Sequence, residues 1–326
     1  MTLPMEFFFF ILQIVAVPVL SPLCIGIIRR LKARLQGRVG ADIFQPYRNL
    51  RKLFAKDEVL SEDASWITRF APYIIFAITL LLGATVPLVT AIAPAIPGYP
   101  EWALTATGDF LIIVYLFGLM TFFLALAGLD AGSGFGGFGS SREMMVAALA
   151  EAGLIFSFLP ASFLAGTGYV LDIVAQLGTL PLSVIFPLFV AFLAFALALL
   201  AENSRFPVDN PATHLELTMI HEAMLLEYSG KRLALMEWAS ANKLLIFIAL
   251  GANIFFPWGV AVEFVSFQTL FLPAFIFAGK TVCFLGAIAL IESLMAKFRI
   301  FRVPDLLFTS FVLGMVAVVL TVSLTL

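Results

Sequence analysis

The sequence predicts an all-α, polytopic membrane protein with about eight transmembrane helices, because of its composition, its apolar runs and its charge distribution. Its 326 residues are 62% hydrophobic and only 12% charged, and the mean hydropathy is +1.05. Soluble domains are about 25% charged, so this number of charges cannot cover an aqueous surface of the same size. The composition excludes a soluble enzyme, a nucleic-acid-binding protein and a disordered chain.

Apolar runs that are long enough to cross a bilayer, about 20 residues each, recur along the whole chain. The first run lacks the positive start and the small-residue cleavage site of a signal peptide, so we expect it to be retained. No soluble domain or repeat separates the runs, and we expect residues 1–326 to form a single integral membrane domain. The expected spans are residues 5–28, 70–93, 106–129, 144–167, 181–202, 243–264, 269–293 and 304–326.

Basic residues predict the orientation of the spans. Every Lys and Arg except Lys280 falls in an odd-numbered connection, namely about 29–69, 130–143, 203–243 or 294–303. Cytoplasmic loops carry the excess of Lys and Arg in membrane proteins. We therefore expect both termini outside, the odd-numbered loops in the cytoplasm, and the protein in the cytoplasmic (inner) membrane.

The first cytoplasmic loop contains a predicted amphipathic helix over residues 43–54. Its apolar residues fall on one helical face, and they are Ile43, Phe44, Tyr47, Leu50, Leu53 and Phe54. Its other side is basic. Two roles remain open: an anchor that lies in the membrane interface, and the wall of a cavity or the seat of a partner.

The third loop contains a glycine-rich stretch at residues 132–139. It has neither the GK[ST] sequence nor the strand–loop–helix setting of a phosphate-binding loop. We expect a tight, closely packed turn, because glycine tolerates backbone conformations that other residues avoid.

The fifth loop concentrates ionisable residues. A helical pattern runs from Pro211 to Glu227, with Asn210 as its N-cap. The candidates are Asp209, His214, Glu216, His221, Glu222 and Glu227. They indicate either a solvated helix or a hydrated acidic funnel that feeds protons into the membrane. The spacing of the two histidines disfavours a zinc site, because seven residues separate them.

Four ionisable residues fall inside or at the end of expected spans: Glu151, Glu202, Lys280 and Glu292. Each costs about 2.5–3.5 kcal/mol on insertion scales, so each is a functional candidate. We predict that they take part in proton relay and coupling. For Lys280, a static ion pair with Glu151 or Glu292 is the alternative.

The two cysteines argue against a redox cofactor on this chain. Cys24 and Cys283 each lie inside an apolar run and form neither a CxxC pair nor an iron–sulfur ligand set. Redox centres are therefore expected on other chains.

Three blocks of sequence together resemble a known family. They are residues 37–53 (GRVGADIFQPYRNLRKL), residues 128–130 with 141–144 (GLD and SREM), and residues 201–209 with 227–230 (AENSRFPVD and EYSG). They resemble the membrane-arm heel subunit of respiratory complex I and its counterpart in group 4 membrane-bound [NiFe] hydrogenases. The resemblance covers nearly the whole chain.

Departures from the quinone-using branch favour the hydrogenase branch. That branch commonly has PEAESEL where this chain has Ala212 and His214 in place of two acids, and it has a fuller GPNRVGP stretch in the first loop. Both differences resemble the formate-hydrogenlyase and hydrogenase-4 component C type. A quinone site is therefore disfavoured.

The resemblance implies a subunit that docks a peripheral redox arm and couples its electron transfer to proton or sodium translocation. The implied partners are hydrogenase-like large and small (iron–sulfur) subunits, which would hold the Ni–Fe and iron–sulfur centres, together with antiporter-like membrane subunits and the lipid bilayer. One alternative is a quinone-reducing relative with its site between helix 43–54 and the first span. Another is a stand-alone secondary ion transporter, although the repeats and broken helices typical of that class are not found. A third is a related complex whose large subunit lacks the nickel-binding cysteines.

The resemblance also assigns residues, none of them catalytic or metal-binding. The family's acids correspond to Glu151, Glu202, Asp209, Glu216 and Glu227. His214, His221 and Glu222 belong to the branch-specific stretch. Lys280 and Glu292 are candidates because of their position inside a span and not because of the resemblance. Docking or cavity roles are expected for Arg38, Asp42, Gln45, Arg48, Asp130, Arg142, Glu143 and Arg205.

Overall fold

The structure, a computed structural model, describes residues 3–60, 64–91, 108–178, 184–210, 219–262 and 270–325. These ranges are mostly helical and contain no β-strand, and eight of their helices are long and apolar enough to cross a membrane, which confirms the predicted fold class. The long helices are α1 (Leu3–Leu35), α3 (Trp66–Thr85), α5 (Phe110–Asp130), α6 (Gly134–Ala165), α8 (Ile185–Glu202), α10 (Gly230–Ile254), α11 (Phe271–Leu294) and α12 (Val303–Thr325). The short helices are α2 (Gln45–Phe54), α7 (Val170–Leu177), α9 (His221–Leu225) and η4 (Ile300–Arg302).

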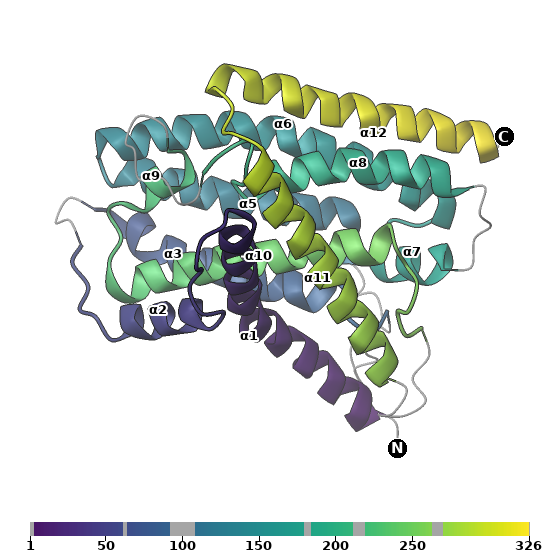
Figure 1. The fold of residues 1–326 in the computed structure, drawn as a ribbon, viewed down its shortest axis with the longest axis horizontal. Coiled ribbons are helices and arrows are strands. Elements are labelled where there is room, and N and C mark those ends of the chain that lie inside the picture. Colours follow the sequence, from purple (N-terminus) through teal and green to yellow (C-terminus); the bar gives the residue numbers. More distant parts are fainter. Residues whose placement is uncertain are drawn as a thin grey trace.

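The arrangement of the helices separates two ends of the molecule (Figure 1). The N- and C-termini lie toward one end of the bundle, whereas α2 and α9 lie toward the other. Helix α10 runs through the middle and packs against α1, α3, α2 and α11, and α12 lies along α6 and α8. Both termini at one end is what an even number of spans requires. Which end faces the cytoplasm stays a prediction of the positive-inside rule.

Helix α2 confirms the amphipathic helix predicted at residues 43–54. It packs on α1 and α10, and Leu50 on its apolar face is buried. At the contact with α1, a Cβ atom added to Gly26 would lie 1.9 Å from the Ile43 carbonyl oxygen. This close backbone approach requires glycine and holds the residues just before α2 against α1. Helix α2 therefore forms part of the wall of a pocket, which is one of the two roles left open by the sequence.

Helix α6 shows that the tight turn predicted at residues 132–139 is wrong, because the helix already starts at Gly134. The Ser133 hydroxyl caps it by accepting a hydrogen bond from the Gly136 N–H at 3.1 Å. A Cβ atom at Gly136 would lie 2.4 Å from the Gly128 carbonyl oxygen of α5. The glycines therefore allow α5 and α6 to approach closely, and the connection between these helices is short.

Helix α10 starts at Gly230, well before the expected span at residues 243–264. Lys231 and Glu237 in its first turns interrupt the apolar run on which the prediction depended. Lys243 therefore lies within the helix, where it is buried. The helix therefore includes the last residues of the stretch that was expected to form the fifth loop, residues 203–243. The short helix α7 was not predicted.

Buried polar side chains join α10 to its neighbours. The Ser21 hydroxyl of α1 donates to Asn242 Oδ1 at 2.6 Å, and Asn242 Nδ2 donates to Thr79 Oγ1 of α3 at 3.0 Å. All three residues are buried, so each hydrogen bond satisfies groups that would otherwise be costly to bury. These bonds fix α1, α3 and α10 relative to one another around the site.

Candidate functional site

An ion pair between Glu202 and Lys243 lies in the interior of the bundle. Glu202 ends α8, and the Lys243 ammonium of α10 lies 2.7 Å from Glu202 Oε2. Only 3% of the Glu202 side chain and 8% of the Lys243 side chain are exposed. Removal of either charge would leave the other buried without its partner, which is strongly destabilising.

A small polar cavity of about 20 Å³ adjoins this ion pair. Glu143, Thr121, Asn203 and Ser240 line it together with the pair itself. A polar cavity of this size can hold a water molecule. Asn203 Oδ1 is buried and has no hydrogen-bond partner among the described residues, so a water in this cavity would satisfy it.

Two carboxylates of α6 belong to the same electrostatic cluster. Glu143 is buried and Glu151 is partly buried, and the charges of Glu202 and Lys243 act on both. The Glu151 carboxylate packs against α5, where a Cβ atom on Gly118 would lie 2.4 Å from Glu151 Oε1. The structure thus brings the predicted relay residues Glu151 and Glu202 together around one cation. Their role as a relay stays a prediction.

A second buried ion-pair group surrounds Glu292 of α11. Its two carboxylate oxygens contact Lys32 Nζ of α1 at 2.9 Å and Arg205 Nη1 at 3.1 Å. Lys32 also lies over the Phe206 ring, 4.6 Å from its centroid. The group connects the end of α8 to α1 and α11, and it has more positive than negative charge.

Asp209 connects the first part of loop 5 (residues 203–229) to the start of α9 and to Lys297. Its Oδ1 lies 2.6 Å from Lys297 Nζ, and its Oδ2 accepts hydrogen bonds from the backbone N–H groups of Ile220 and His221, both at 3.2 Å. These bonds satisfy donors at the start of α9 and fix its first residue. The continuous helix predicted for residues 211–227 is therefore wrong in extent, since residues 219 and 220 are not helical and α9 ends before the last predicted residues.

His221 lines both the small cavity and the larger pocket described below. Burial, reinforced by the nearby positive charge of Lys243, lowers its pKa from 6.5 to about 4. Asp209 opposes this shift but does not overcome it. The His221 ring is therefore neutral at physiological pH.

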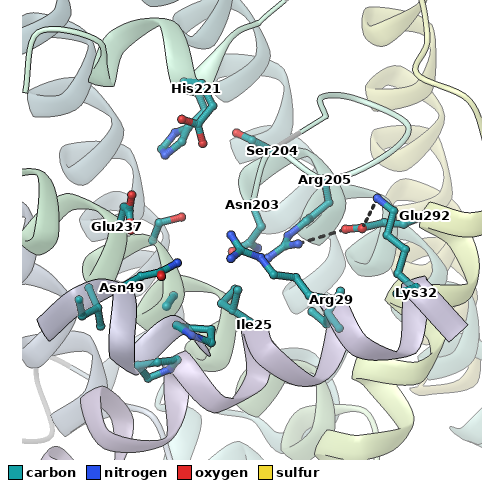
Figure 2. Close-up of a pocket in the computed structure, with 18 of the residues that line it drawn as sticks. Ile25, Arg29, Lys32, Asn49, Asn203, Ser204, Arg205, His221, Glu237 and Glu292 are labelled. Atoms are coloured by element: carbon teal, nitrogen blue, oxygen red, sulfur yellow. Dashed lines mark hydrogen bonds and ion pairs between the residues drawn. The ribbon is translucent and has the colours of Figure 1, made fainter. Parts of the chain in front are cut away.

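A larger pocket of about 510 Å³, which we call the α1–α2 pocket, opens between α1, α2, loop 5 and α10 (Figure 2). Its apolar lining includes Pro22, Ile25 and Leu50, and its charged lining includes Arg29 and Glu237. Four residues line both this pocket and the small cavity: Asn203, Ser204, His221 and Ser240. They form a thin partition between the open pocket and the buried ion pair.

The predicted docking or cavity residues range from exposed to buried. Arg38, Asp42 and Arg48 are exposed near α2, where Arg48 pairs with Asp42 at 2.8 Å, and Gln45 donates to Asn49 at 3.0 Å. Asp130 and Arg142 are partly exposed: Asp130 accepts hydrogen bonds from Ser65 and Thr68 at the start of α3, and Arg142 donates to the Met219 carbonyl. Glu143 and Arg205 are buried.

The remaining relay candidates have separate positions. Glu222 lines the α1–α2 pocket and Glu227 is exposed in the turn after α9, whereas His214 and Glu216 lie outside the described residues. Lys280 donates to the Phe256 carbonyl at 2.5 Å and lies 3.4 Å from Asn253 Oδ1. The alternative that Lys280 pairs with Glu151 or Glu292 is therefore wrong.

The sequence did not identify several residues of the site, above all Lys243. Its ion pair became visible only once α10 was extended back to Gly230, and the polar pair Asn242–Lys243 inside an apolar run was the available signal. Lys32 and Lys297 looked like ordinary basic residues of cytoplasmic loops. Their carboxylate partners are on distant helices or loops, which local patterns do not reveal.

Metal ligation is not supported by the described residues, because no group of three or more His, Cys, Asp or Glu side chains among them is arranged to hold an ion. The two cysteines stand on different helices, Cys24 buried in α1 and Cys283 exposed in α11. What the described chain offers is a set of protonatable groups around a water-sized cavity.

Fold and site together define a polytopic, helical membrane protein built around buried ion pairs. Residues 8–323 match the family described as NADH dehydrogenase, and the chain belongs to this family.

Three relatives illustrate its place in the family. The chain is 32% identical to formate hydrogenlyase subunit 4 of Escherichia coli, with 92% of this chain and 94% of the relative covered. It is 31% identical to hydrogenase-4 component C of Escherichia coli, with 95% and 94% covered. It is 29% identical to NADH-quinone oxidoreductase subunit 8 of Thermus thermophilus, with 75% and 67% covered. The resemblance to the hydrogenase branch is thereby confirmed.

A solved structure shows the same fold. A chain of the membrane-bound sulfane sulfur reductase, an archaeal respiratory membrane complex, superposes with a TM-score of 0.79 and 20% identity, with 97% of this chain and 99% of that chain covered. By their names these relatives are a subunit of formate hydrogenlyase, a component of hydrogenase-4 and a chain of an archaeal respiratory membrane complex, and this chain shares with them a multi-pass helical membrane fold.

Proposed function

We propose that this chain is the membrane subunit on which the peripheral arm of an energy-converting, hydrogenase-type complex sits, and that it couples electron transfer in that arm to proton or sodium translocation. The similarity to formate hydrogenlyase subunit 4 and hydrogenase-4 component C supports this proposal. The chain itself holds no redox cofactor. The Ni–Fe and iron–sulfur centres belong to hydrogenase-like large and small subunits, and antiporter-like membrane subunits carry the translocated ions.

The observation that carries the coupling proposal is the thin partition between the α1–α2 pocket and the Glu202–Lys243 pair. A proton that crosses this partition through water can reach Glu202 and break the ion pair. The Lys243 charge is then compensated by Glu143 and Glu151, which already lie in its field. When Glu202 ionises again, its proton passes inward. Loop 5 adjoins this path, so a movement of Arg205 or Asp209 would change the energy of each step.

A docking surface for the peripheral arm is proposed at the end of α1 and the start of α2. Val39 is fully exposed and Phe44 is 58% exposed there, among the charged side chains of Arg38, Asp42 and Arg48. Exposed apolar residues flanked by charges are typical of protein interfaces. In the orientation that the positive-inside rule predicts, this surface faces the cytoplasm from the inner membrane. Substitution of Arg48 by Glu is expected to reduce co-purification of the peripheral subunits without loss of the membrane arm.

The test of the coupling proposal uses Glu202→Gln and Glu151→Gln in the assembled complex, with Asp57→Asn as the matched exposed control. Both test variants are expected to lose ion pumping in sealed vesicles and to slow the coupled redox reaction per assembled complex, whereas the control pumps normally. Glu202→Gln also leaves Lys243 without its direct partner and should lower the yield of assembled complex. Wild-type pumping and redox rates in both test variants would refute the relay.

The quinone alternative has one observation in its favour, since the α1–α2 pocket lies where that alternative places its site. The charged groups that line the pocket make it a poor match for a neutral ring. Inhibition by quinone analogues that label α1 and α2 would favour this alternative. Isolation of the chain alone in a transport-active form would instead favour a secondary transporter.

A further inference from the structure

We propose that the α1–α2 pocket binds the headgroup of a zwitterionic phospholipid of the phosphatidylethanolamine type, with its phosphate toward Arg29 and Arg205 and its ammonium toward Glu237. This inference does not depend on the proposed coupling function. It rests on the shape of the pocket, on its polarity along α1 and on the separation of charges across it.

The polarity of the pocket changes steadily along α1. Its lining on this helix runs from Pro22 and Ile25 to Arg29 and Lys32 and ends at Gln36. These residues cover about 20 Å of helix at 1.5 Å per residue. An apolar stretch that leads into a charged stretch within a membrane-embedded helix is complementary to an amphiphile, with its acyl chain beside Ile25 and its headgroup beside Arg29. Basic pockets between helices at the cytoplasmic side are known sites for lipid headgroups.

The charged part of the α1–α2 pocket, around Arg29, is where we place the lipid headgroup, and one side of it is basic. Lys32 and Arg205 share the single carboxylate of Glu292, which leaves this group one positive charge in excess. Arg29 adds another charge, and no hydrogen bond or ion pair of its guanidinium is found within the described part of the chain. Figure 2 shows Arg29 rising from α1 beside Arg205 and Asn203. Two neighbouring guanidinium groups match a phosphate in charge and in hydrogen-bonding geometry.

The opposite side of the headgroup region is acidic. Glu237 of α10 lines the pocket across from Lys32, Arg205 and Glu292 (Figure 2). Its carboxylate forms no ion pair with any basic side chain that the structure describes, although it lies in the field of Arg29. A phosphate placed at Arg29 would leave Glu237 facing the ammonium end of the same headgroup. A neutral quinone ring or a purely anionic lipid would use only part of this arrangement.

The test measures retained phospholipid in the purified, assembled complex after an extended wash with lipid-free detergent, quantified by class with mass spectrometry. The variants are Arg29→Gln and Glu237→Gln, with exposed Arg34→Gln and Asp57→Asn as matched controls. Loss of a charge-assisted contact predicts about tenfold less retained phosphatidylethanolamine in Arg29→Gln. Glu237→Gln should lower phosphatidylethanolamine and raise the share of phosphatidylglycerol, and both controls should match wild type.

A second measurement distinguishes a lipid from a soluble phosphate. The complex is placed in vesicles of phosphatidylethanolamine and phosphatidylglycerol that contain a photoactivatable phosphatidylethanolamine with its label in the acyl chain. Labelling of α1 around Ile25 that Arg29→Gln reduces supports the proposal. Equal retention in all variants, recovery of a quinone in place of phospholipid, or retention of soluble phosphoethanolamine without labelling at Ile25 would overturn it.

Discussion

Lys243 and Lys280 both carry an ammonium group inside a membrane span, and their surroundings are opposite in kind. Lys243 contacts the carboxylate of Glu202 and lies near two further acids beside a water-sized cavity. Lys280 contacts the Phe256 carbonyl just after the end of α10, and its other near group is a neutral amide. The first lysine belongs to a network of ionisable groups, whereas the second satisfies backbone and amide oxygens.

The difference teaches that two charges inside spans can have unlike contacts, one with a carboxylate and one with neutral oxygens. A buried cation that contacts a carboxylate forms a pair in which loss of either charge leaves the other without its partner. A cation at a helix C-terminus stabilises the exposed carbonyl groups there. Position in the sequence selected Lys280 and missed Lys243, although the contacts favour the opposite choice. Four changes test whether the two lysines differ in function as their contacts do.

The largest effect is expected for Lys243→Met. The substitution leaves Glu202 buried without a counter-charge, at a cost of about 3–5 kcal/mol. We expect little assembled complex and no ion pumping, measured by gel filtration and by a pH-sensitive dye in vesicles. The double variant Lys243→Met, Glu202→Gln should regain assembly but not pumping. Wild-type assembly of the single variant would show that the pair is not the buried centre of the protein.

A smaller effect is expected when Gly118 becomes Ala. The new methyl group would lie 2.4 Å from Glu151 Oε1, so the carboxylate must move. The contact is with the end of a flexible side chain, so the cost in stability should be small, and the expected effect is slower pumping because the Glu151 carboxylate is displaced. Gly279→Ala, next to Lys280, is the matched control because a Cβ atom there meets open space. Equal pumping in the two variants would contradict a functional position for Glu151.

Because of His221, the stability of the protein should depend on pH. Its pKa is about 4 in the folded protein and 6.5 ordinarily, so between these values the unfolded chain binds more protons. Stability is then full above pH 6.5 and falls as the pH is lowered toward 4, by at most about 1.4 kcal/mol per pH unit.

Melting temperatures across this range measure the slope, which His221→Gln should flatten and Lys280→Met should leave unchanged. A slope that persists in His221→Gln would assign the pH dependence to another group.

The smallest effect is expected for Lys280→Met. Loss of the contact with the Phe256 carbonyl should cost about 1 kcal/mol of stability. Pumping should continue, because no carboxylate contact of Lys280 is found in the described part of the chain. Thermal melting and vesicle assays measure the two outcomes. If pumping stops while the complex stays intact, Lys280 belongs to the relay as its sequence position predicted, and the contrast with Lys243 disappears.

Local patterns were sufficient for the elements but not for their contacts. The amphipathic helix at residues 43–54 was predicted because its apolar face is visible in the order of its residues. The start of α10 was missed because Lys231 and Glu237 look like loop residues until the helix is seen to continue through them. The glycines of residues 132–139 were taken for a turn because close helix packing and turn formation favour the same residue.

The membrane class, the number of spans and the family can be predicted from the order of residues, because hydrophobic run length and motif spacing are properties of neighbouring residues. Which charges contact each other depends on how the helices pack. Glu202 and Lys243 are 41 residues apart, Arg205 and Glu292 are 87 apart, and Lys32 and Glu292 are 260 apart. In a low-dielectric interior a charge needs a partner within hydrogen-bond distance, and only the packing of the helices determines which partner that is.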